Sequence, residues 1–225
     1  MKVNRFLSTA VFCLGFFAAG SASANLITIT DSPTGRTSFG GNDIVNWGSL
    51  GGDYTVVSNP FNISSTGGIG LTVSQSSGSF ERRDLNTGWG GNFTDGSTLL
   101  WTGGNNAQPM SLSFNSLIRG IGFQINPNWN ETNTHIEVFG AGNVLFGAFD
   151  LTTNDRNQAS ADFIGFTSDL LDIAKITISQ GSNSDFAINQ LSLITNGRQS
   201  VPEPASLALL GLALAGVAAS RRRKN

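Results

Sequence analysis

Apolar and polar residues alternate in short runs along most of this chain, and that period of two constrains the fold more than any other feature. Residues 69–74, 120–125 and 175–179 each alternate in this way, and clusters of Gly, Asn, Asp and Ser separate the runs. Successive side chains of a β-strand point to opposite faces, so the pattern predicts half-buried strands. About ten to twelve such runs predict an all-β domain, an antiparallel β-sandwich of the jelly-roll or Greek-key kind.

Two runs depart from simple alternation. Residues 144–151 are apolar without a clear alternation, so we expect a strand that is buried on both faces. In the last run, Phe186 and Ile188 share one parity, whereas Leu191 and Leu193 share the other. One strand buries both sets on the same face only if it contains an extra residue. We therefore predict a bulge or bend at the Asn-Gln pair that separates them.

Two tryptophans lie in loops that are rich in Gly and Asn. Trp89 is in G-W-G-G-N, and Trp129 is in N-P-N-W-N. Indole faces stack on sugar rings and nearby carboxamides satisfy sugar hydroxyls, which makes both residues candidates for glycan binding. The alternative is that each tryptophan caps one end of the core, because tryptophan is mostly buried in folded proteins. Trp47 and Trp101 stand beside apolar residues and are expected in the core.

The sequence offers little for catalysis. His135 is the one histidine, and no G-x-S-x-G elbow supports a serine triad built on it. His135 and Glu137 are two apart and share the outer face of a predicted strand, but no third metal ligand is evident. A polysaccharide hydrolase would need two carboxylates about 5 to 9 Å apart in a cleft, and Glu81, Asp84, Glu131 and Glu137 are available. We predict a protein that is not an enzyme and holds no metal or cofactor.

Residues 1–24 have the form of a signal peptide. Two positive charges precede an apolar run over residues 6–19, and Ala22 and Ala24 then give the small-x-small pattern of a signal-peptidase site. We predict that signal peptidase cuts the chain there and leaves Asn25 as the first residue of the exported form.

The charge of the remaining body excludes one class of partner. Residues 25–200 contain 14 acidic and 7 basic side chains, a net charge of −7. Nucleic-acid binding needs a basic surface, so we expect none. Cys13, the one cysteine, lies within the signal peptide. The core of the exported form must therefore be stabilised by burial rather than by disulfide bonds.

Residues 201–225 have three parts. Pro202, Glu203 and Pro204 come first, and the prolines hold the chain extended. The uncharged segment 205–220 favours a helix that would span roughly 24 Å, slightly less than a hydrocarbon core of about 30 Å. We expect a transmembrane helix that thins the bilayer locally. A basic cluster follows and stays on the cytoplasmic side; it consists of Arg221, Arg222, Arg223 and Lys224.

Pro-Glu-Pro, a short apolar helix and an Arg-rich end together resemble the PEP-CTERM sorting signal. This resemblance implies that an exosortase, a membrane-embedded transpeptidase-like protease of Gram-negative bacteria that make extracellular polysaccharide, reads residues 201–225. Residues 88–93, 99–102, 120–125 and 186–193 also resemble, more loosely, the bodies of some PEP-CTERM proteins. That second resemblance implies a secreted sandwich similar to lectin-like and carbohydrate-binding modules, without catalytic residues.

These observations divide the chain into four parts and predict a function. The parts are a signal peptide (1–24), a β-sandwich (25–194), a linker (195–200) and the sorting signal with its transmembrane helix (201–225). We predict an exported, exosortase-processed protein of the cell surface or extracellular matrix, which is anchored transiently in the inner membrane and binds exopolysaccharide. A polysaccharide hydrolase and a purely structural or adhesive biofilm component are the alternatives.

Overall fold

The computed structural model describes residues 27–31, 39–90, 93, 98–104, 109–128, 132–154, 161–181 and 184–196. The predictions for the signal peptide and its cleavage site, for Trp129, for most of the linker and for the sorting signal lie outside these residues. None of the helices within the described ranges has the length and apolarity needed to cross a membrane.

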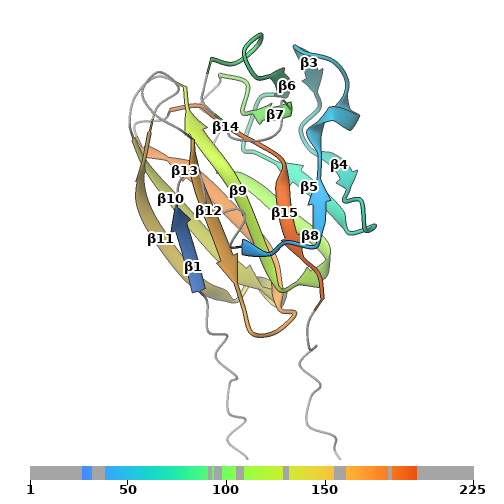
Figure 1. Cartoon of the computed structure of the whole chain (residues 1–225), viewed down its shortest axis with the longest axis vertical. Coiled ribbons are helices and arrows are strands. Elements are labelled where there is room, and N and C mark those ends of the chain that lie inside the picture. The colour runs from blue at the N-terminus through green and yellow to red at the C-terminus, as the bar shows by residue number, and fades with distance from the viewer. Residues whose placement is uncertain are drawn as a thin grey trace, which may run out of the picture.

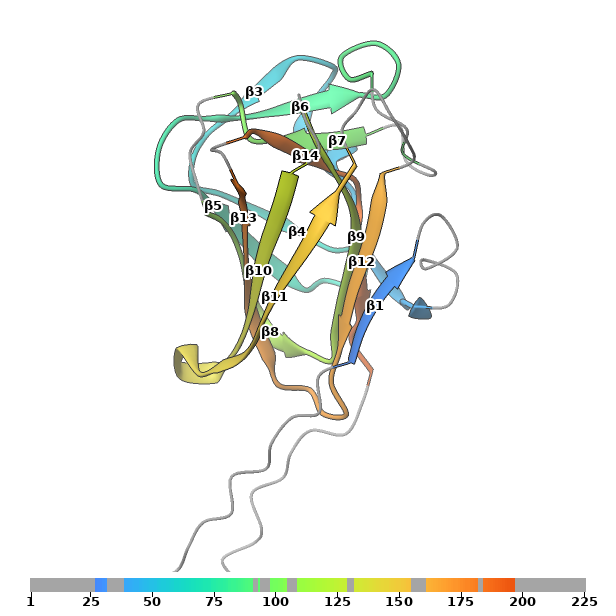
Figure 2. The ribbon, with the colours of Figure 1, turned by 90° about the vertical axis from the view of Figure 1, so that its left-hand side faces the viewer.

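The described part of the chain forms two β-sheets that pack face to face (Figures 1 and 2). All named strand pairs are antiparallel, which confirms the predicted antiparallel sandwich. The nine-stranded sheet contains β1 (Ile27–Asp31), β2 (Asp43–Val45), β3 (Thr55–Val57), β6 (Phe80–Asp84), β7 (Thr98–Trp101), β9 (Gly120–Pro127), β12 (Asp162–Thr167), β14 (Phe186–Ile188) and β15 (Leu191–Ile194). The six-stranded sheet contains β4 (Phe61–Ser64), β5 (Gly70–Ser74), β8 (Met110–Ile118), β10 (Thr132–Gly140), β11 (Leu145–Thr153) and β13 (Ile173–Gln180). Two 3-10 turns, η1 (Trp47–Leu50) and η2 (Ala141–Asn143), complete the elements.

One continuous core lies between the sheets. Leu112, Ile176 and Val138 reach into it from the six-stranded sheet, and Phe123 and Phe166 reach into it from the other. These residues occupy alternate positions of their strands, because only every second side chain of a strand faces the partner sheet. The alternating runs of the sequence therefore predicted the inner face of each sheet.

The two sheets differ on their outer faces. Every residue of β9 is buried, whereas β5 alternates strictly between buried and more exposed positions. Part of the outer side of the nine-stranded sheet is covered, because Trp89 and Phe93 pack there against Leu99. Phe39 covers a second area of the same side. No described segment packs in this way on the outer side of the six-stranded sheet, where polar side chains are exposed.

The predicted bulge is present in the last strand. Its first half, β14, pairs Ile188 with Ile125, and its second half, β15, pairs Ser192 with Gly122. Four steps along one strand thus match three steps along β9, so one residue is extra. Because of the extra residue, Phe186 and Ile188 as well as Leu191 and Leu193 lie in the same core, as the sequence predicted. Asn189 at the bulge is fully buried.

The strand predicted over residues 144–151 is present as β11, but its predicted burial on both faces is wrong. β11 is the last strand of its sheet, and its side chains alternate between exposed and half-buried positions over most of its length. Its apolar residues lack an obvious alternation because Gly147 and Ala148 are small and tolerate either face. The sequence pattern also did not indicate β7, which pairs with β6 and β14.

Both ends of the described body leave from one end of the sandwich (Figures 1 and 2). The strand registers show this directly, since Ile27 pairs with Thr167, Thr167 with Gly120, and Gly120 with Ile194. Pro127 ends β9 at the opposite end, roughly 24 Å away at about 3.4 Å per residue. Any tether that follows Ile194 therefore leaves from the end where β1 begins.

Candidate functional site

The outer face of the six-stranded sheet carries a row of side chains that runs across five strands. Each member stands opposite the next in the strand register. Neighbouring strands are about 4.8 Å apart, so the row is about 19 Å long. We call it the transverse row; from β10 to β4 it consists of Phe139, Lys175, Ser113, Thr72 and Asn62.

The chemistry of the transverse row changes from one end to the other. At the β10 end, the Lys175 ammonium lies 4.1 Å from the centre of the Phe139 ring and donates a hydrogen bond of 2.8 Å to Asn143. At the β4 end, the Thr72 hydroxyl donates to the Asn62 carboxamide oxygen over 2.7 Å. The row thus ends in uncharged donors and acceptors on the side of β4.

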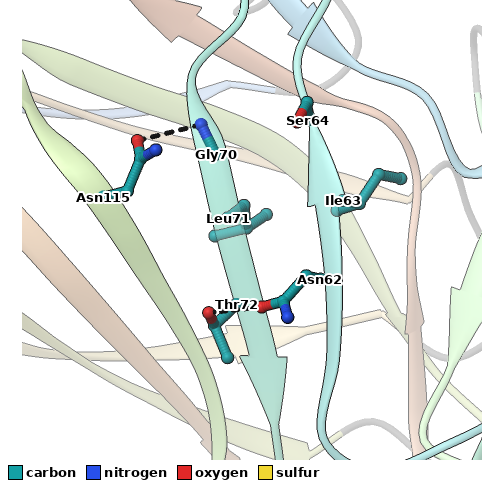
Figure 3. Close-up of a pocket in the computed structure, with 7 residues that line it drawn as sticks. All are labelled: Asn62, Ile63, Ser64, Gly70, Leu71, Thr72 and Asn115. Atoms are coloured by element: carbon teal, nitrogen blue, oxygen red, sulfur yellow. Dashed lines mark hydrogen bonds between the residues drawn. The ribbon is translucent and has the colours of Figure 1, made fainter.

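A hollow of about 400 Å³ lies at this uncharged end, between β4, β5 and β8 (Figure 3). Asn115 contributes a carboxamide whose oxygen accepts from the Gly70 backbone N–H at 2.9 Å. Gly70 leaves the space for it, because a Cβ at that position would stand 2.5 Å from Asn115 Nδ2. The lining contains no charged side chain; it consists of Asn62, Ile63, Ser64, Gly70, Leu71, Thr72 and Asn115.

A charged group lies at the other side of the same face. His135 and Glu137 share the outer face of β10, as predicted, with 4.0 Å between Nε2 and Oε1. Asp150 on β11 adds a carboxylate 2.8 Å from His135 Nδ1. The sequence did not single out Asp150, because only the pairing of β10 with β11 places it opposite His135. Glu137 also accepts from the Thr177 hydroxyl at 3.0 Å. Across the described part of the chain, no three metal-binding side chains are placed to hold an ion.

Trp89 is buried, as expected from the alternative interpretation in which the loop tryptophans cap the core. Only 3% of the residue is exposed, its indole N–H donates to Asn126 over 3.2 Å, and its ring packs beside Leu99. A sugar ring has no access to the indole face in this arrangement. Trp47 is fully buried and donates to the Asn189 carbonyl over 2.8 Å, so its predicted place in the core is confirmed.

Trp101 is only half-buried, at the far end of the nine-stranded sheet. The Arg83 guanidinium lies 4.5 Å from its ring centre and 4.1 Å from that of Tyr54, so the cation is held between two aromatic rings. The indole N–H of Trp101 donates to Asp185 over 2.6 Å. Arg83 also forms an ion pair with Glu81 at 2.9 Å, so its charge is balanced within this cluster. We interpret it as a cap on the end of the sheet.

Two carboxyl groups outside the outer face have shifted pKa values. Burial works to raise the pKa of Asp43, but hydrogen bonds from the Ser65 and Thr66 hydroxyls and the Gly67 and Ile44 N–H groups outweigh it, and the pKa is lowered. Because Ser65 and Thr66 follow β4 and Asp43 begins β2, these bonds connect the two sheets.

The second group is Asp172, whose pKa is raised by burial, with a smaller contribution from the negative charge of Asp169. Its backbone N–H donates to Ile118 over 3.2 Å, in the connection between β12 and β13. Asp172 is not among the residues that line the hollow, so this shift does not indicate a general acid there.

The sequence matches the family model of the PEP-CTERM protein-sorting motif over residues 200–224. The chain therefore carries this sorting motif, as the resemblance implied. No curated protein matches the sequence.

Among solved structures, the chain is similar to a DUF4465 family protein from Bacteroides caccae, with 12% identity, a TM-score of 0.39, and coverage of 76% of this chain and 100% of that one. It is also similar to CsCBM6-3 from Clostridium stercorarium in complex with cellobiose (10% identity, TM-score 0.33, 65% and 100% covered). A family 29 carbohydrate-binding module from Piromyces equi is a third (17% identity, TM-score 0.32, 64% and 91% covered). Similarity at this level does not transfer a ligand to this chain.

Proposed function

We propose that the protein is an exported, non-catalytic component of the cell surface or extracellular matrix, and that the outer face of its six-stranded sheet binds a neutral polysaccharide. The observation that carries this proposal is the difference between the two sheets. In the nine-stranded sheet, β9 is buried on both sides, whereas the six-stranded sheet presents a polar face about 19 Å across with a hollow at its uncharged end. Polar faces on rigid strands can position donors and acceptors for sugar hydroxyls.

The side chains of the hollow fit an uncharged sugar. The carboxamides of Asn62 and Asn115 use their oxygens as acceptors within the sheet, so their N–H groups are oriented for other acceptors. Hydroxyls of Ser64 and Thr72 stand beside them. An anionic polymer would also be repelled by a body with a net charge of −7. The proposed ligand is therefore a chain of neutral sugars rather than of uronic acids.

The sorting motif supports the proposed location. A motif at residues 200–224 implies processing by an exosortase at the membrane after export, and the predicted signal peptide supplies the export step. The chain leaves its final strand, β15, at the end of the sandwich where β1 begins. A tail held in the membrane would therefore leave the whole outer face of the six-stranded sheet accessible. Release from the tail would then deliver the domain to the surface or the matrix.

A glycan array with the exported protein tests the proposal. We expect binding to neutral polysaccharides and weaker or no binding to polyuronates. Gly70→Ala is the informative variant, because the added Cβ must displace Asn115 and partly fill the hollow; binding should fall at least tenfold. Gly90→Ala is the matched control, since no atom lies within 4 Å of its added Cβ. Unchanged binding by Gly70→Ala, or no glycan bound at all, would refute this assignment.

The hydrolase alternative makes a different prediction for the same samples. It needs two carboxylates in one cleft, and no carboxylate lines the hollow. Incubation of the exported protein with each bound polysaccharide should release no new reducing ends. Release that depends on Glu137 or Asp150 would favour the hydrolase.

A further inference from the structure

One edge of the six-stranded sheet is long and has no partner among the described strands. β11 (Leu145–Thr153) is the last strand of that sheet and pairs only with β10. It has nine residues, whereas the other edge strands described in the two sheets, β1, β2, β3 and β4, have five, three, three and four. In Figure 2, β11 faces the viewer and no described segment lies over it.

The sequence of β11 lacks the features that normally prevent an edge strand from pairing. Such edges usually carry lysine or proline, or are interrupted by bulges. The run L-F-G-A-F-D-L-T-T contains no lysine, arginine or proline. Its bulge, at Phe146, lies next to the first residue, since Val138 pairs with Gly147 and Phe139 with Leu145. Seven residues, 147–153, are therefore regular and offer their outward backbone groups to another strand.

The strand has one acidic side chain, and this side chain makes a contact within its own sheet. Asp150 lies 2.8 Å from His135 on β10. At the start of the strand, Val144 and Leu145 are 59% and 51% exposed. An edge with a single charge and with exposed apolar residues at one end favours association with a similar surface.

We propose that β11 pairs antiparallel with β11 of a second copy of this chain and joins two six-stranded sheets into one sheet of twelve strands. A two-fold axis through the middle of the strand makes the interface self-complementary, so one sequence supplies both sides. The charge of Asp150 selects the register. Centring the axis on Phe149 places Asp150 opposite Ala148 of the copy, whereas centring it on Asp150 would oppose two carboxylates, which is unfavourable.

This pairing has a consequence for the outer face. The polar faces of the two copies become continuous, and the two hollows, each centred on β5, lie roughly 43 Å apart at about 4.8 Å per strand. If the proposed glycan binding holds, a polysaccharide long enough to reach both hollows would bind more tightly than a short one. The pairing itself rests only on the edge and not on glycan binding.

The test is the mass of the exported protein in solution, measured by sedimentation at increasing concentration. We expect a dimer. Ala148→Asp should shift it to the monomer, because two new carboxylates would face Asp150 of the copy, whereas Ala148→Lys should strengthen it. Leu117→Asp, a similar change at an exposed position of the interior strand β8, should leave the dimer unchanged. A wild-type monomer at every concentration, or equal effects of the two changes at position 148, would overturn the proposal.

Cross-linking gives a second readout that does not depend on weakening the dimer. The sequence after the predicted cleavage site contains no cysteine, so a single cysteine can be placed at will. In the proposed register the two copies of position 148 are diagonal neighbours, about 7–8 Å apart. Ala148→Cys should therefore be linked by a short bifunctional thiol reagent. Ser113→Cys, roughly 34 Å from its copy at about 4.8 Å per strand, should not. Equal linking at both positions, or at neither, would contradict the pairing.

Discussion

Asn189 allows a quantitative test of how the last strand is held in the core. Its side chain makes two hydrogen bonds to Gln124, accepting from the backbone N–H at 2.8 Å and donating to Oε1 at 2.9 Å. Both residues are buried. Asn189→Ala removes these bonds and leaves two polar groups of Gln124 without them. A buried group that loses its partner costs about 1–3 kcal/mol, so we expect a loss of about 3 kcal/mol in the free energy of unfolding.

The assay is urea unfolding of the exported protein, followed by tryptophan fluorescence, together with thermal unfolding. A loss of about 3 kcal/mol corresponds to a fall of about 6–12 °C in Tm for a domain of this size. Asn62→Ala is the matched control, since Asn62 is exposed and surface changes usually stay within about 0.5 kcal/mol. If Asn189→Ala and Asn62→Ala have the same effect, the bulge is not held by this side chain and the reasoning is wrong.

Three further predictions concern acid stability, packing and sorting. The folded pKa of Asp43 lies below its ordinary value of 3.8, so its stabilising contribution is present above about pH 4 and is lost as the pH falls toward the folded pKa. Asp43→Asn should therefore be less stable than wild type at neutral pH, and the difference in the free energy of unfolding should become smaller in acid. A difference that does not depend on pH would refute this. Gly122→Ala should lower the free energy of unfolding by about 1–3 kcal/mol, because the new Cβ would stand 2.6 Å from Phe163. Gly52→Ala is the control and should change it little, since no atom lies within 4 Å of its new Cβ. Similar melting temperatures of the two variants would contradict the described packing. Glu203→Ala should block removal of the tail, so that mass spectrometry finds the uncut C-terminus in the membrane fraction; normal processing would show that the motif is not read through this glutamate.

The sequence predicted the inner faces of the sheets because burial on one face leaves a period of two. The same reasoning located the bulge, since the parity change between Ile188 and Leu191 has one simple structural solution. These features depend on neighbours along one strand, which a linear pattern contains.

The features that the sequence did not predict depend on contacts between distant segments. The transverse row exists only because four strand registers place its members opposite one another. Asp150 joins His135 in the same way. The edge position of β11 could not be predicted, because strand order is set by the whole fold. Trp89 is covered by packing that a Gly-rich loop sequence does not reveal.

Hydrogen–deuterium exchange of the exported protein, with and without a bound neutral polysaccharide, tests the central claim most directly. The outer face of the six-stranded sheet should be protected, with the largest change in peptides from β4, β5 and the Asn115 region of β8. Peptides from β9, which is buried on both faces, provide the internal reference and should not change. Protection that falls on the nine-stranded sheet, with none on β4, β5 and β8, would contradict the claim that the open sheet is the binding surface.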